Sequence, residues 1–116
     1  MKIAIDVSPL TTSRLLQHRV RGVGTYIENL KEALLRYYPD NSYIFFTRGE
    51  KLPGDIDLVH YTYFEPFFLT FPSRESFPTV VTVHDLTPLV FPKHFPAGVV
   101  GNAKWLIQRF LLQRTA

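Results

Sequence analysis

The chain has 116 residues, a formal charge of +3 and no cysteine. Its length suits one domain, and the lack of cysteine excludes disulfides, thiolate catalysis and zinc–sulfur sites. A hydrophobic fraction of 46% and a charged fraction of 20% are typical of globular proteins, so a disordered chain is not expected. The mild basic excess, without a long run of lysine or arginine, fits phosphate-bearing small molecules or a peripheral membrane contact as well as nucleic acid.

The apolar stretches of the sequence are short. The N-terminal one stops at Asp6, which makes it too short for the apolar region of a signal peptide. No stretch approaches the roughly 18–20 residues of a membrane span. We therefore expect a cytoplasmic chain, with membrane association limited to a contact at the inner face.

Strand and helix patterns alternate along the chain. Residues 2–7 form a continuous apolar segment, as in a strand buried on both faces of a parallel sheet. The alternation predicts an α/β domain, a Rossmann-like parallel sheet flanked by helices. Strand patterns occupy residues 2–7, 43–47, 56–61 and 79–83, and helical patterns occupy residues 25–38 and 99–114.

The stretch Arg21-Gly22-Val23-Gly24 is expected to form a tight loop that opens the first helix. Glycines allow a backbone to approach a ligand closely, and Thr25 with Glu28 three residues later is a capping-box pattern. The polar loop predicted at residues 8–21 carries basic side chains suited to a phosphate or diphosphate. A solvated loop followed by a capped helix explains the same residues.

Residues 61–78 combine many aromatic side chains with three prolines. Such a segment, which begins with Tyr61, could line a pocket or touch lipid, but packing onto the sheet is the favoured interpretation. No lysine or arginine run accompanies these aromatic residues, so nucleic-acid binding is not expected.

His84 and Asp85 directly follow the strand pattern at residues 79–83. Ligands of open α/β sheets bind outside the carboxyl ends of the strands, which is also where Gly22 and Gly24 are expected. His84 can exchange a proton near neutral pH, and Asp85 could orient it. The alternative is a structural pair, with His84 bonded to a backbone carbonyl and Asp85 capping a turn.

Three segments in this order resemble the start of a family 4 retaining glycosyltransferase. They are residues 2–6 (KIAID), 21–30 (RGVGTYIENL) and 82–89 (TVHDLTPL). Residues 91–96 and the helix that bears Trp105 continue the match, so the resemblance covers nearly the whole chain.

The resemblance implies a GT-B architecture, in which two Rossmann-like domains face each other across a cleft. Residues 1–116 would be a truncated N-terminal, acceptor-side domain, and the C-terminal domain that holds the nucleotide-sugar donor would be absent. The implied reaction moves a hexose from the donor to a sugar, lipid-linked or polysaccharide acceptor with retention, without a required metal or other cofactor. This stretch alone is expected to be inactive.

The resemblance also supplies roles for individual residues. Gly22 and Gly24 match glycines that approach the donor, and His84 matches a histidine that hydrogen-bonds near the reacting sugar. The candidate substrate-binding residues are Arg21, Gly22, Val23, Gly24 and Tyr61, and the candidate catalytic residues are His84 and Asp85.

Two other classes of protein were compared with these features. A dinucleotide oxidoreductase would place G-x-G-x-x-G directly after the first strand, whereas here the glycines come well after Asp6 and Ile27 stands at the third glycine position. A non-catalytic Rossmann-like binding module remains the alternative.

Overall fold

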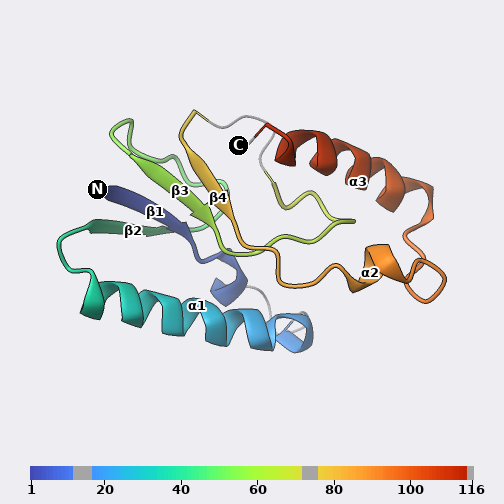
Figure 1. Ribbon diagram of the computed structural model, residues 1–116, viewed down its shortest axis with the longest axis horizontal. Coiled ribbons are helices and arrows are strands. Elements are labelled where there is room, and N and C mark those ends of the chain that lie inside the picture. Colours follow the sequence, from blue (N-terminus) through green and yellow to red (C-terminus); the bar gives the residue numbers. More distant parts are fainter. Residues whose placement is uncertain (12–16, 72–75, 115–116) are drawn as a thin grey trace.

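The computed structural model describes residues 1–11, 17–71 and 76–114, with side chains described for all of these except 17–21. Its centre is a four-stranded sheet in the order β2-β1-β3-β4, and all neighbouring strands are parallel (Figure 1). This confirms the predicted α/β class. The strands are β1 (Lys2–Asp6), β2 (Ser42–Phe46), β3 (Leu58–Tyr61) and β4 (Thr79–Val81).

Helices lie on both sides of this sheet. The long helix α1 (Gln17–Tyr37) joins β1 to β2 on one side, and α3 (Gly98–Leu112) lies on the other (Figure 1). A short 3-10 helix, η1 (Ser8–Thr11), follows β1, and the four-residue helix α2 (Thr87–Val90) lies between the predicted strand at residues 79–83 and α3, where no helical pattern was predicted. Among the described residues, no helix combines the length and the apolar character that crossing a bilayer requires.

The core has one layer on each face of the sheet. On the α1 side, Ile27 of α1 is fully buried together with Ile5 of β1. On the opposite side, Ala4 pairs with Val59 in register, and these two residues belong to a buried aromatic and aliphatic cluster. β1 is covered on both faces, as its continuous apolar sequence predicts.

The aromatic segment after β3 packs between the sheet and α3. Tyr61 contacts Phe46 and Phe71 at ring distances of 6.0 and 5.5 Å, and all three are buried. Phe64, also buried, meets Trp105 of α3 edge-on at 6.4 Å. The favoured interpretation of this segment, packing onto the sheet, is therefore confirmed. The segment also forms the surface on which α3 packs.

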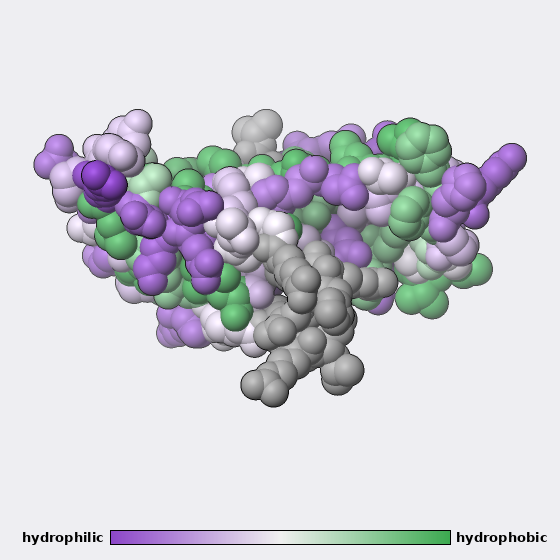
Figure 2. Space-filling model, turned by 90° about the horizontal axis from the view of Figure 1, so that it is seen from below, coloured by the Kyte–Doolittle hydropathy of each residue, from purple (hydrophilic) through white to green (hydrophobic). Residues whose placement is uncertain are grey.

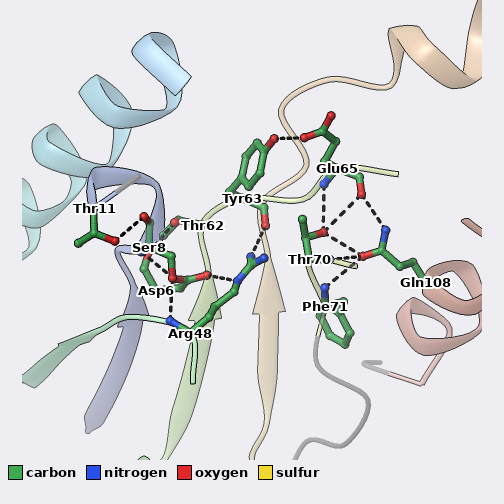
Figure 3. Close-up of polar contacts among 10 residues, drawn as sticks. All are labelled: Asp6, Ser8, Thr11, Arg48, Thr62, Tyr63, Glu65, Thr70, Phe71 and Gln108. Atoms are coloured by element: carbon green, nitrogen blue, oxygen red, sulfur yellow. Dashed lines mark hydrogen bonds and ion pairs between the residues drawn. The ribbon is translucent and has the colours of Figure 1, made fainter. Parts of the chain in front are cut away.

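Gln108 fixes α3 to this segment. Its side chain is fully buried, and its Oε1 accepts hydrogen bonds from the backbone N–H groups of Thr70 and Phe71 at 2.8 and 3.1 Å (Figure 3). Its Nε2 donates to the carbonyl oxygens of Glu65 and Pro66 at 2.7 and 2.8 Å. A polar side chain can therefore be buried on the inner face of α3, because this face meets main-chain groups as well as the Phe64 ring.

Candidate functional site

The carboxyl ends of the four parallel strands meet at one edge of the sheet. From β1 the chain passes to β2 on one side, and later to β3 on the other side of β1. Such a reversal leaves a crevice at the carboxyl ends of β1 and β3, where open α/β sheets bind ligands. The polar residues at this edge define the candidate site.

A buried ion pair lies at the end of β1. Asp6 is fully buried, and its Oδ2 is 2.9 Å from Nε of Arg48, which follows β2 (Figure 3). The other carboxylate oxygen accepts hydrogen bonds from the backbone N–H of Ser8, at 2.9 Å, and from the Ser8 hydroxyl. Each oxygen of the buried carboxylate thus has a partner, as a buried charge requires.

The same ion pair fastens the end of β3. Arg48 also donates to the carbonyl oxygen of Tyr63 at 3.0 Å, and the Thr62 hydroxyl donates to the carbonyl of Asp6 at 2.6 Å. These contacts cross from β2 over β1 to the chain after β3, so they close the crevice between β1 and β3 with protein groups. Asp6, Arg48 and Thr62 therefore serve to hold the edge together.

A second polar group faces α1 at the ends of β3 and β4. The Thr82 hydroxyl lies 2.7 Å from Nε2 of His60 and 3.4 Å from the Tyr26 hydroxyl of α1. The Tyr26 ring meets the His84 ring edge-on at a centroid distance of 4.8 Å. Tyr26, His60, Thr82 and His84 form what we call the histidine cluster.

The contact of His84 with the main chain fixes the tautomer of its neutral ring. Nε2 is 2.9 Å from the carbonyl oxygen of Thr62. A carbonyl oxygen can only accept a hydrogen bond, so Nε2 carries the proton and Nδ1 of the neutral ring is an acceptor. His84 is exposed, so Nδ1 can accept a hydrogen bond from a ligand hydroxyl.

This cluster favours the neutral form of His60. Burial lowers its pKa from the ordinary value of 6.5, and the positive charge that His84 can carry lowers it further, while the Asp6 carboxylate opposes both effects. His60 lies in the strand predicted at residues 56–61, and no role was predicted for it. A histidine within an otherwise apolar strand was the only signal that could have pointed to one.

Asp85 points to a neighbouring turn. Its Oδ1 accepts hydrogen bonds from the backbone N–H of Thr87, at 2.7 Å, and from the Thr87 hydroxyl, and these two bonds lower the pKa of Asp85. Asp85 therefore orients the start of α2. The contacts of His84 and Asp85 match the structural alternative that the sequence left open, and His84 retains Nδ1 for a further contact.

The predicted glycine loop is wrong. Helix α1 begins at Gln17, so Gly22 and Gly24 lie inside it, and neither has a positive φ. Thr25 and Glu28 accordingly stand in mid-helix and cannot cap its start. The error arose because two close glycines were given more weight than the helical spacing of Val20, Val23 and Ile27, and tertiary packing can outweigh a glycine penalty of about 1 kcal/mol per residue.

Gly24, unlike Gly22, lies where α1 passes η1. A Cβ at Gly24 would meet Cδ2 of Leu10 in η1 at 3.7 Å, whereas a Cβ at Gly22 would meet no described atom within 4 Å. Gly22 stands one helical turn before Tyr26, so a position of α1 without a side chain adjoins the histidine cluster. Val23 is half-buried on the same helix, and the side chain of Arg21 lies outside the described residues, as do residues 12–16 of the predicted basic loop.

Tyr61 lies away from the histidine cluster. Its side chain points to the opposite face of the sheet, in the core, and lines a cavity of about 360 Å³ together with Arg48 and Thr70. The structure thus brings His84 close to α1, but separates Tyr61 from both.

Comparison with protein-family models, with curated proteins and with solved structures gave no match. The geometry of the site and the resemblance of the ordered motifs therefore carry the functional argument.

Proposed function

We propose that the chain is the acceptor-side domain of a retaining glycosyltransferase of GT-B architecture. In this proposal a hexose moves from a nucleotide-sugar donor to a sugar, lipid-linked or polysaccharide acceptor, and a second, donor-binding half is required for turnover. The observation that carries the proposal is the position of His84. It follows β4 at the carboxyl edge, within the motif that resembles the family, and presents an acceptor nitrogen.

The role proposed for His84 is a hydrogen bond to a hydroxyl of the reacting sugar. Its ring is oriented by the Thr62 carbonyl on one nitrogen and by the edge contact with Tyr26. A preoriented group costs no reorganisation when the transition state forms, which is the basis of its catalytic value. Asp85 would act only indirectly, by setting the turn that follows His84.

The role of the glycines changes with their position in α1. Gly22 carries no side chain one turn from Tyr26 and has no described neighbour there, so a sugar could reach the histidine cluster across it. We retain Gly22, Val23 and Gly24 as contact candidates on this helical surface, in place of a loop that wraps a diphosphate.

One observation favours a non-catalytic binding module instead. His84 is bonded to the main chain and Asp85 to Thr87, which is also what a purely structural pair would do. The two functions differ in what happens to a bound sugar, so a binding experiment alone does not separate them.

Saturation-transfer NMR on the chain, with UDP-glucose, GDP-mannose and a panel of mono- and disaccharides, tests sugar binding. We expect signals on at least one sugar, and His84→Ala should weaken that binding about fivefold, because a hydrogen bond to a neutral group is worth about 1 kcal/mol. His94→Ala changes another exposed histidine and is the matched control.

Transfer is then measured with the chain joined to a donor-binding half. There His84→Ala should lower turnover by roughly 10²–10³ at unchanged melting temperature. Binding without transfer would favour the non-catalytic module. Equal effects of the His84 and His94 variants, or loss of folding in proportion to activity, would make His84 structural and remove the proposal.

A further inference from the structure

The outer face of α3 is apolar and exposed. Val99, Leu106 and Phe110 are 87%, 63% and 53% accessible, and Ala103 and Ile107 are exposed with them. Residues 99, 103, 106 and 110 recur at intervals of four and three, which places them on one helical stripe. We call Val99, Ala103, Leu106, Ile107 and Phe110 the α3 outer stripe.

This arrangement inverts the usual orientation of a surface helix. The buried positions of α3 are Gly101 and the polar Gln108, and the stripe points away from them. Apolar side chains also gather at the neighbouring end of the molecule, around α2 and the start of α3, and green atoms lie at the right-hand end of Figure 2. Exposed examples there are Val90, Phe91, Phe95 and Val100.

The part of the sequence that carries the stripe has charges of one sign. Residues 86–116 contain four of the 13 lysine and arginine residues and none of the 10 acidic ones, so they carry a formal +4 while the remaining chain carries −1. Arg109 and Arg114 of this region are exposed, and the Arg114 guanidinium lies 4.3 Å from the centre of the Phe110 ring. Cations therefore stand directly beside the apolar side chains.

We propose that the α3 outer stripe binds the surface of an anionic lipid bilayer. A helix with an apolar stripe, adjacent lysine and arginine and too little length to span lies in the interface plane, with its apolar side chains among the acyl chains. Basic residues add attraction to anionic headgroups. The proposal does not depend on the glycosyltransferase assignment.

Other occupants fit the observations less well. A second copy docked stripe to stripe would bring two regions of +4 together, which is unfavourable. A protein partner would need an acidic groove shaped to this convex helix, whereas a bilayer requires no complementary shape.

The test is co-sedimentation of the whole chain with vesicles. We expect binding to vesicles of phosphatidylcholine with phosphatidylglycerol, much weaker binding to phosphatidylcholine alone, and loss of binding as salt rises. Absence of binding to the anionic vesicles would overturn the proposal. Equal binding to the two kinds of vesicle at every salt concentration would also overturn it.

Variants locate the binding surface. Leu106→Gln combined with Phe110→Gln should weaken binding about tenfold or more, because two large apolar side chains are removed from the lipid. Leu35→Gln on α1 is the matched control, since Leu35 is also an exposed helical leucine, 50% accessible, and should bind like the wild type. Equal loss for both variants would contradict the assignment to α3.

Charge variants test the anionic contact. Arg109→Gln and Arg114→Gln should each weaken binding to the anionic vesicles about fivefold, while Arg36→Gln on α1 should not weaken it.

Light scattering and binding to an acidic polypeptide test the other two occupants of the stripe. A stable dimer that is dissociated by Leu106→Gln would assign the stripe to a second copy of the chain. If the chain instead binds polyglutamate, and Leu106→Gln weakens that binding as much as it weakens vesicle binding, the stripe would be assigned to a protein partner. Either result would overturn the lipid proposal.

Discussion

At the scale of single residues, the ion pair between Asp6 and Arg48 is the most consequential interaction. Asp6 is fully buried, so removal of its cation leaves an uncompensated charge in a medium of low polarity. We predict that Arg48→Met lowers the free energy of unfolding by about 3–5 kcal/mol, measured by urea denaturation.

Two comparisons sharpen this prediction. Arg36→Met removes an exposed arginine of α1 and should change stability by no more than about 0.5 kcal/mol. Addition of Asp6→Asn to Arg48→Met should restore part of the loss, because the buried charge is then gone. A loss in Arg48→Met no larger than that in Arg36→Met would show that the pair does not hold the edge.

His60 should make stability depend on pH. Its pKa is lowered in the folded state from 6.5, so below about pH 6.5 the unfolded chain binds the proton more readily. The stabilising contribution is therefore complete above that value and is lost as the pH falls through the lowered folded pKa. We predict that the melting temperature falls between neutral and mildly acidic pH.

His60→Gln isolates this effect. Glutamine can keep a polar contact with the Thr82 hydroxyl but does not titrate, so the variant should lose part of the acid sensitivity. His94→Gln, which changes an exposed histidine, should keep the wild-type profile. Identical profiles for wild type and His60→Gln would mean that His60 is not the responsible group.

The sequence allowed some of these residues to be identified, but not their partners. The position of His84 at the carboxyl edge followed from the strand pattern before it. The pairing of Asp6 with Arg48 spans 42 residues, and that of His60 with Thr82 spans 22. Both depend on strand order and side-chain direction, which local patterns do not encode.

At the scale of elements, glycines inside helices serve two different purposes. A Cβ at Gly101 of α3 would lie 2.8 Å from Cβ of Ala97 and 3.5 Å from Cβ of Phe67. Gly22 and Gly24 of α1 leave ordinary or open space. Glycine is thus required by packing in α3 and only tolerated in α1.

We predict opposite effects of alanine at these positions. Gly22→Ala and Gly24→Ala should raise the free energy of unfolding by about 0.5–1 kcal/mol each, because alanine favours helix and fits. Gly101→Ala should lower it by about 1–2 kcal/mol, because overpacking outweighs the helix preference. Thermal unfolding of the three variants checks this, and a stabilised Gly101→Ala would show that α3 can shift at no cost.

Some element boundaries were predicted more accurately than others, and the difference has a physical reason. β1, β2 and α3 were placed within two residues, because their apolar patterns are continuous or periodic. The start of α1 was missed by eight residues, since glycine and capping signals inside a helix resemble those at its start. α2 was missed because one turn carries almost no periodic signal.

At the scale of the whole molecule, alternation of strand and helix patterns was sufficient to predict the parallel sheet. Because the strands are parallel, the ends of β3 and β4 lie at the same edge as the end of β1, and the order β2-β1-β3-β4 makes these three ends neighbours. The position of the site at that edge could be predicted from the sequence. The contacts of Arg48, Thr62 and Tyr63 that close the crevice could not be predicted, because they arise only when the strands are assembled.

The attachment of α3 through Gln108 has a consequence for how the native state opens. Residues 65–71 present main-chain groups to one glutamine side chain, so release of that side chain, together with separation of Trp105 from Phe64, loosens the segment and the helix together. Cooperative openings of this kind lie below global unfolding in free energy. Amide protons of α3 and of residues 70–71 should therefore exchange with deuterium as one unit, sooner than those of β1 and β3, whose exchange waits for the whole sheet to separate.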